Sequence, residues 1–154
     1  MKQLLLFLLA TFSFFSCKRE STTLYTATIS NNTNHKILIE YFENGSLVTE
    51  KNIILNPNSI FEIAKGVDKG ISNYGGFDSD YYGDSAIVTF DDTFKIVHCF
   101  GNIISNSSKK YLYSSTRNLF NYLSYEYNYI DESKIKRNAT YKYIFSEQDY
   151  LDTQ

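Results

Sequence analysis

The residues able to act as nucleophile, base or soft metal ligand are few in this chain of 154 residues, which has two histidines and two cysteines. His98 and Cys99 are adjacent, and a histidine with a cysteine is the pair that makes a thiolate nucleophile and its base. In a strand, however, neighbouring side chains point to opposite faces and cannot hydrogen-bond to each other. The sequence therefore predicts no catalytic dyad there, a buried apolar role for Cys99 and a solvated turn position for His35.

Carboxylates are concentrated in one short stretch, Asp78-Ser79-Asp80-Tyr81-Tyr82-Gly83-Asp84. Hard oxygen ligands are those that Ca²⁺ prefers, so the candidate metal ligands are Asp78, Asp80 and Asp84. The spacing departs from an EF-hand loop, because Tyr82 and Thr89 stand where that loop has a ligand and its bidentate Glu. Two interpretations stay open: a solvated acidic loop, which the pattern favours, and a loose extracellular-type Ca²⁺ site. Apart from that calcium site, no cofactor is expected.

Three tyrosines, Tyr74, Tyr81 and Tyr82, belong to the same stretch. Tyrosine offers a large rigid face and a polar tip at low entropy cost, so these residues could stack on a sugar or anchor a protein partner. The alternative is that they are core or edge residues, and the absence of tryptophan counts against a dedicated carbohydrate module. The chain has no phosphate-cradling glycine loop, CxxC pair, HExxH helix or GxSxG elbow.

The N-terminal segment has the three zones of a secretory signal: Lys2, an apolar stretch over 4–15, and Ser16 before the change in polarity. It is too short to span a bilayer as a helix. The stretch Phe14-Phe15-Ser16-Cys17 resembles the lipobox of bacterial lipoproteins. The resemblance implies a signal peptide over 1–16, a diacylglycerol on the sulfur of Cys17 and an acylated new N-terminus. The alternative is an ordinary signal with an incidental cysteine.

Two or more acyl chains on Cys17 would hold the mature chain stably on a lipid bilayer, whereas one chain holds only reversibly. The sequence then predicts a lipidated cysteine and short tether over 17–23 and a single domain over 24–154. The residue after the cysteine is Lys18 and not an aspartate, which resembles lipoproteins that move on to an outer membrane. The implied location is the cell envelope, on the periplasmic or the surface face of that membrane.

Composition limits the partners and the redox chemistry. The net charge is −2, with no cluster of Lys and Arg, so nucleic acid is not an expected partner. With Cys17 carrying lipid, Cys99 is the only other thiol, and an intramolecular disulfide is excluded. The 14 tyrosines and 12 phenylalanines suit a β-rich domain outside the cytoplasm.

Short β-branched and aromatic runs alternate with turn residues, which favours an antiparallel two-sheet sandwich, Ig-like or related, with one or two short C-terminal helices. Asn44-Gly45 between apolar runs predicts a tight hairpin, and Asp91-Asp92 predicts another. Ser146 predicts a helix start, with Asp149 three residues on. The expected strands are 24–29, 36–42, 47–49, 53–55, 59–64, 86–90, 94–100, 125–130 and 140–145; the expected loops are 66–83 and 101–110, and a helix is expected over 116–123.

A family resemblance involves both ends of the chain. The lipobox, Asn118-Leu119-Phe120 and the closing stretch from Tyr141 to Tyr150 together resemble small, largely uncharacterised lipoproteins of the Bacteroidota. The resemblance implies a cellular location and a fold, but not an activity. Asp84-Ser85-Ala86 is similar to the short O-glycosylation motif of that group, which implies a glycan on Ser85; an unmodified loop end is the alternative.

These observations favour a membrane-anchored envelope lipoprotein that is not an enzyme. It would bind or scaffold another envelope protein or a glycan through its loops, above all through 66–83. Two other classes of protein stay open. One is a toxin-immunity lipoprotein, and the other is a small metal-dependent accessory enzyme that uses Asp78, Asp80 and Asp84.

Overall fold

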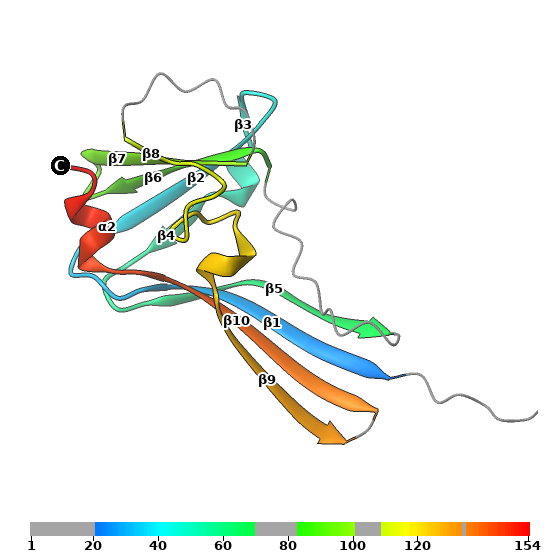
Figure 1. Cartoon of the computed structure of the whole chain (residues 1–154). Helices are drawn as coiled ribbons and strands as arrows, with labels where there is room; N and C mark the ends of the chain where they lie inside the picture. Colours follow the sequence, from blue (N-terminus) through cyan, green and yellow to red (C-terminus); the bar gives the residue numbers. More distant parts are fainter. Residues whose placement is uncertain (1–20, 70–82, 101–108, 134) are drawn as a thin grey trace, which may run out of the picture.

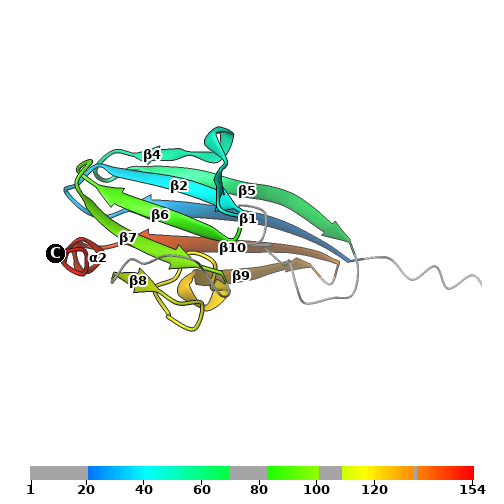
Figure 2. The ribbon, with the colours of Figure 1, turned by 90° about the horizontal axis from the view of Figure 1, so that it is seen from above.

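The chain folds as two packed β-sheets (Figures 1 and 2). The structure is a computed structural model, and it describes residues 21–69, 83–100, 109–133 and 135–154. Sheet A has the order β5 (Ile60–Lys69), β1 (Thr22–Asn31), β10 (Lys136–Phe145) and β9 (Glu126–Ser133). Sheet B has the order β3 (Ser46–Leu47), β2 (Ile37–Glu43), β6 (Ser85–Phe90), β7 (Phe94–Cys99) and β8 (Lys110–Tyr111), with β4 (Ile53–Leu55) also paired to β2.

The predicted two-sheet β-sandwich is therefore confirmed. Most neighbouring strands are antiparallel, as predicted, but each sheet also contains one parallel pair. In sheet A the first strand pairs with the last, with Thr22 opposite Lys136 and Asn31 opposite Phe145. In sheet B, β8 runs parallel to β7. Each sheet is therefore mixed. In sheet A, β1 and β10, the first and last strands of the described chain, pair along their whole length.

Alternation along each strand divides every sheet into a core face and an outer face. In β1, Ala27 and Ile29 are fully buried against sheet B, whereas Leu24 and Thr26 point to the outer face, away from sheet B. The core between the sheets is aliphatic and aromatic. Its largest fully buried hydrophobic side chains are Tyr143, Phe90, Phe120, Phe145, Ile29, Ile37, Ile39, Leu55, Ile96 and Val88.

Both predicted hairpins are present. Asn44 and Gly45 have φ of 51° and 77°, as a type I′ turn requires, and they join β2 to β3. Asp91 and Asp92 have φ of 48° and 58° and join β6 to β7. Asn and Asp tolerate this left-handed conformation better than other residues with a side chain, which is why they form the two turns.

Three local predictions are wrong. Gly66–Lys69 continues β5 and is not the start of a loop, because Val67 and Gly66 pair directly with β1. The expected helix over 116–123 is a series of turns followed by a single turn of 3₁₀ helix, Tyr122–Ser124. The expected tether over 17–23 is too long, since β1 already begins at Thr22. A further short 3₁₀ turn, Thr49–Lys51, precedes β4.

The predicted C-terminal helix is α2 (Glu147–Leu151). Ser146 and Asp149 form a capping box, in which Asp149 accepts the backbone N–H of Ser146 at 2.7 Å. Figure 1 shows α2 across one end of the sandwich, beside the turns from β1 to β2 and from β6 to β7. We call this the α2 end.

The opposite end of sheet A is formed by one row of paired residues, Lys69, Thr22, Lys136 and Ser133. We call it the Thr22 end. Figure 1 shows the long strands of sheet A running past the edge of sheet B toward this end. A ten-residue strand is about 33 Å long, so the two ends of the domain are well separated.

Candidate functional site

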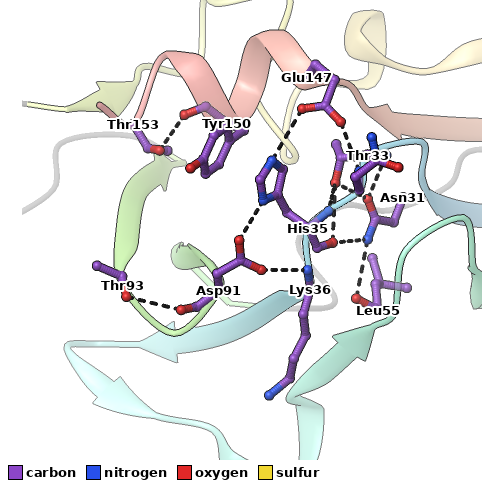
Figure 3. A network of polar contacts seen from close by, with 11 residues as sticks. Asn31, Thr33, His35, Lys36, Leu55, Asp91, Thr93, Glu147, Tyr150 and Thr153 are labelled. Atoms are coloured by element: carbon purple, nitrogen blue, oxygen red, sulfur yellow. Dashed lines mark hydrogen bonds and ion pairs between the residues drawn. The ribbon is translucent and has the colours of Figure 1, made fainter.

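One polar cluster lies at the α2 end and is centred on His35 (Figure 3). His35 Nδ1 lies 2.5 Å from Asp91 Oδ2, and its Nε2 lies 3.4 Å from Glu147 Oε2. The imidazole ring stacks on Tyr150, with ring centroids 3.6 Å apart and planes 14° apart. Residues from the β1–β2 turn, the β6–β7 turn and α2 thus meet on one ring, which we call the His35 clamp.

Both carboxylates of the clamp also bind backbone. Asp91 accepts the backbone N–H of Lys36 at 3.0 Å, and Glu147 accepts the backbone N–H of Asn34 at 2.9 Å. The hydrogen bond to His35 is the main reason why the pKa of Asp91 lies below its usual value. A protonated imidazole can donate to both carboxylates, whereas a neutral one can donate to only one. The clamp is therefore suited to hold three chain segments together.

Next to the clamp, the fully buried Asn31 organises two turns. Its side-chain N–H groups donate to the backbone carbonyls of His35 (2.8 Å), Leu55 (3.3 Å) and Asn56 (3.0 Å). Its side-chain oxygen accepts from both the N–H and the hydroxyl of Thr33, at 3.0 and 2.7 Å. Every polar atom of this buried amide has a partner, so the amide joins the β1–β2 turn to the segment after β4.

A second polar cluster surrounds Arg117, in the segment between β8 and β9. Its guanidinium contacts Asp149, and also binds the hydroxyls of Ser146 and Tyr111, both at 3.2 Å. The Tyr111 hydroxyl donates to Asp152. Burial and this hydrogen bond raise the pKa of Tyr111, and the same hydrogen bond is the main cause that lowers the pKa of Asp152. The cluster attaches α2 to the β8–β9 segment.

The adjacent His98 and Cys99 point to opposite faces of β7, as predicted. His98 is fully buried on the core side, where Nδ1 accepts the backbone N–H of Leu119 at 3.0 Å. Its Nε2 has no hydrogen-bond partner in the described part of the chain. Burial, assisted by the charge of Arg117, lowers the pKa of His98 to about 3, which keeps the ring neutral. Cys99 is a free, buried cysteine whose thiol pKa is raised by burial, which confirms the predicted apolar role.

His35 does not occupy the solvated position that the sequence predicted. Its side chain is only 21% exposed, because Tyr150 covers one face and two carboxylates approach its nitrogens. The partners Asp91 and Glu147 lie 56 and 112 positions further along the chain. No local pattern around His35 indicates them, so the sequence contained no signal that could have revealed the clamp.

Of the three predicted metal ligands, the structure describes Asp84 alone. Its carboxylate accepts the backbone N–H of Asn44 at 2.8 Å and the hydroxyl of Ser85 at 3.0 Å, so it supports the β2–β3 hairpin. Gly83, just before it, has φ of 104°, and a Cβ there would overlap the carbonyl oxygen of Phe42. A calcium ion at Asp84 would compete with these hydrogen bonds.

Ser85, the predicted glycan acceptor, begins β6 and is 8% exposed. Its hydroxyl donates to Asp84, so a glycan on Ser85 would replace that hydrogen bond. The glycan, like the calcium site, stays a prediction. The remaining predicted site residues lie outside the described residues: Cys17, Tyr74, Asp78, Asp80, Tyr81 and Tyr82.

Two general features of the described residues bear on function. Within 21–69, 83–100, 109–133 and 135–154, no group of three or more His, Cys, Asp and Glu side chains could hold a metal ion. No helix in those same ranges has the length and hydropathy needed to cross a membrane. The polar clusters that do exist join turns to α2, and what they can do chemically is to keep one end of the sandwich rigid.

Comparison of the chain with protein-family models, with curated proteins and with solved structures finds no match in any of the three.

Proposed function

We propose that this protein is an envelope lipoprotein, anchored to a bilayer through a lipidated Cys17, whose sandwich domain binds or scaffolds another envelope molecule without catalysing a reaction. The observation that supports this most directly is the position of β1. Its first residue, Thr22, follows Cys17 by only five residues. A lipid on Cys17 would therefore hold a folded domain close to the bilayer.

The rigid α2 end supports a binding role. His35, Asn31 and Arg117 cross-link the turns there through side chains, so the backbone of that end is organised before any partner arrives. Preorganised surfaces bind at lower entropy cost than flexible ones. The predicted ligand-contact residues Tyr74, Tyr81 and Tyr82 belong instead to the chain segment between β5, which ends at the Thr22 end, and β6, so a contact through them would be separate from one at the α2 end. The ligand class that this proposal favours is a protein or a glycan of the envelope.

The anchor is tested by growing cells with a radioactive fatty acid and comparing the natural chain with a Cys17→Ala variant. The natural chain should incorporate label and fractionate with membranes, and the variant should do neither. Release of the processed natural chain into the aqueous fraction with a free thiol would contradict the proposal.

The binding role is tested by affinity capture from detergent-solubilised membranes with a tagged mature chain. Specific recovery of one envelope protein or glycan is expected. A matched chain with Tyr74, Tyr81 and Tyr82 replaced by Ser should lose that partner if the predicted contacts are correct. Recovery of no partner, together with calcium-dependent thermal unfolding, would contradict the binding role and favour the metal-dependent alternative.

A further inference from the structure

Three exposed aliphatic side chains form a row across the outer face of sheet A, near the Thr22 end. Leu24 of β1 pairs with Val67 of β5, and on its other side Leu24 pairs with Asn138, which in turn pairs with Ile130 of β9. Residues in register across a sheet share a face, so all of these side chains point away from sheet B. Leu24, Val67 and Ile130 are 39%, 55% and 54% exposed. We call them the aliphatic row.

Lysines flank this row on the same face. Lys65 and Lys69 lie two residues before and after Val67 on β5, and both are exposed. Neither is in an ion pair with another described residue. Lys136 is also nearby, but Glu132 lies 2.5 Å from its amine and offsets its charge.

Among the described acidic residues of the outer face, Glu132 lies near the Thr22 end, where it pairs with Lys136, and the others lie further from that end. Glu62 and Glu126 belong to the row of Thr28 and Lys142, four residues along β1 from Leu24, or roughly 13 Å away. Counting only residues that the structure describes, the outer face is thus aliphatic near the Thr22 end, with Lys65 and Lys69 outside any ion pair, and more acidic toward the α2 end. Among the described elements, none covers this face in Figure 1.

The length of the tether determines what this face can reach. Five residues span at most about 17 Å, so a lipidated Cys17 would keep Thr22 within that distance of its own lipid. The aliphatic row begins two residues further on, about 7 Å along β1. Lysine stems lie along apolar surface with their amines in water, and juxtamembrane lysines are attracted to anionic lipid headgroups.

We propose that the outer face of sheet A at the Thr22 end rests on the bilayer surface, with the aliphatic row at the headgroup boundary and Lys65 and Lys69 bound to anionic lipid headgroups. The α2 end then points away from the membrane. This inference rests on the proposed lipid anchor at Cys17, and it adds a second contact that sets the orientation of the domain.

The test uses the full lipidated chain in vesicles of phosphatidylcholine mixed with phosphatidylglycerol. An environment-sensitive fluorophore is attached at Val67→Cys in one variant and at Gln148→Cys, on the exposed side of α2, in another. Cys99 is buried and the sulfur of Cys17 would be blocked by lipid, so the label is confined to the new cysteine. Lipids carrying a headgroup spin label should quench the fluorophore at Val67→Cys strongly and leave that at Gln148→Cys almost unquenched.

Equal, weak quenching at both positions, in protein that floats with the vesicles, would overturn the orientation while leaving the anchor intact. Protein that does not float with the vesicles would instead contradict the anchor. The two failures are therefore distinguishable.

The lysines are tested with the double variant Lys65→Gln, Lys69→Gln. Quenching at Val67→Cys should be stronger with phosphatidylglycerol than with phosphatidylcholine alone, and the double variant should lose this difference. Each lysine is expected to change the ratio of docked to undocked protein about fivefold. A double variant that keeps the full response to phosphatidylglycerol would contradict the proposed headgroup contact.

Discussion

The two ends of sheet A differ in how their polar groups are used. At the α2 end, His35 and Asn31 connect segments that are distant in sequence, and their side chains are largely or fully buried. At the Thr22 end the ion pairs Glu132–Lys136 and Asp131–Arg137 link β9 to β10 across a single hairpin, and most of those side chains are solvated. Polar groups therefore stabilise the tertiary structure at one end and face the surroundings at the other.

The difference follows from the lengths of the strands. In sheet A, β1 and β10 have ten residues each, whereas β2 and β6 in sheet B have seven and six. Sheet A therefore continues beyond sheet B, and among the described strands none lies over its last rows. Substitutions at the α2 end should accordingly lower stability much more than matched substitutions at the Thr22 end.

The largest effect is expected from Asn31→Ala. The change leaves three backbone carbonyls and Thr33 without the partner they have now, and unsatisfied buried groups cost about 1–3 kcal/mol each. We expect a loss of roughly 3 kcal/mol or more in the free energy of unfolding, measured with urea. The matched control is Asn138→Ala near the Thr22 end, where the amide binds the exposed Glu132 and the loss should be about 0.5 kcal/mol. Similar losses in the two variants would contradict the comparison.

The second effect is a pH dependence caused by His98, in the core between the ends. Its folded pKa of about 3 lies below the usual 6.5, so the unfolded chain takes up a proton first as the pH falls. The free energy of unfolding should have its full value above pH 6.5 and should be about 2 kcal/mol lower at pH 5. Carboxylates contribute little to a change over this pH range. Urea unfolding at both pH values measures this. In a His98→Gln variant, which can still accept the Leu119 N–H, the fall should disappear; its persistence would show that another group titrates.

A smaller effect is expected from His35→Phe. The phenyl ring can keep the stacking on Tyr150 but cannot bind Asp91 or Glu147. Because both carboxylates are about half exposed, we expect a loss of only about 1 kcal/mol in the free energy of unfolding. The neighbouring Lys36→Gln removes an exposed pair with Asp92 and should change stability by less than about 0.5 kcal/mol. A His35→Phe variant as stable as Lys36→Gln would show that the clamp does not stabilise the fold.

The smallest effect is expected from Val67→Ser on the aliphatic row. Val67 is more than half exposed, so the free energy of unfolding should stay within about 0.5 kcal/mol of the natural value. Thermal unfolding of the detergent-solubilised protein measures this. A loss above about 1.5 kcal/mol would mean that the aliphatic row is packed in the folded domain. The conclusion that the outer face is exposed at the Thr22 end would then be wrong.

Much of the local structure could be predicted because short-range rules decide it. Asn44-Gly45 and Asp91-Asp92 form turns because their residues tolerate positive φ, and Ser146 with Asp149 caps a helix because both partners lie within one turn. The helix expected over 116–123 failed for a long-range reason. Asn118 donates to the carbonyls of Cys99 and Tyr111 and accepts the Phe120 N–H, which holds that segment in turns against the core.

Motifs in the sequence did not indicate the polar cluster that the structure shows around His35. They indicated Cys17, which lies outside the described residues and whose lipidation stays a prediction, and Asp84, whose hydrogen bonds to Asn44 and Ser85 followed from strand pairing. His35 looked like a solvated turn residue because the side chains that surround it come from distant segments. A pattern within one segment contains no information on which other segment will approach it.

By itself, the sequence determined most of the strands, the tight turns, the helix cap and the packing role of Cys99. Each of these depends on backbone preferences or on the alternation of side chains within a few residues. The tertiary structure alone decided that β1 pairs in parallel with β10, that His35 joins three segments, and that the lysines near Val67 share a face with an exposed aliphatic row. Those outcomes depend on the register between strands far apart in the chain, which is selected by burying the whole core at once.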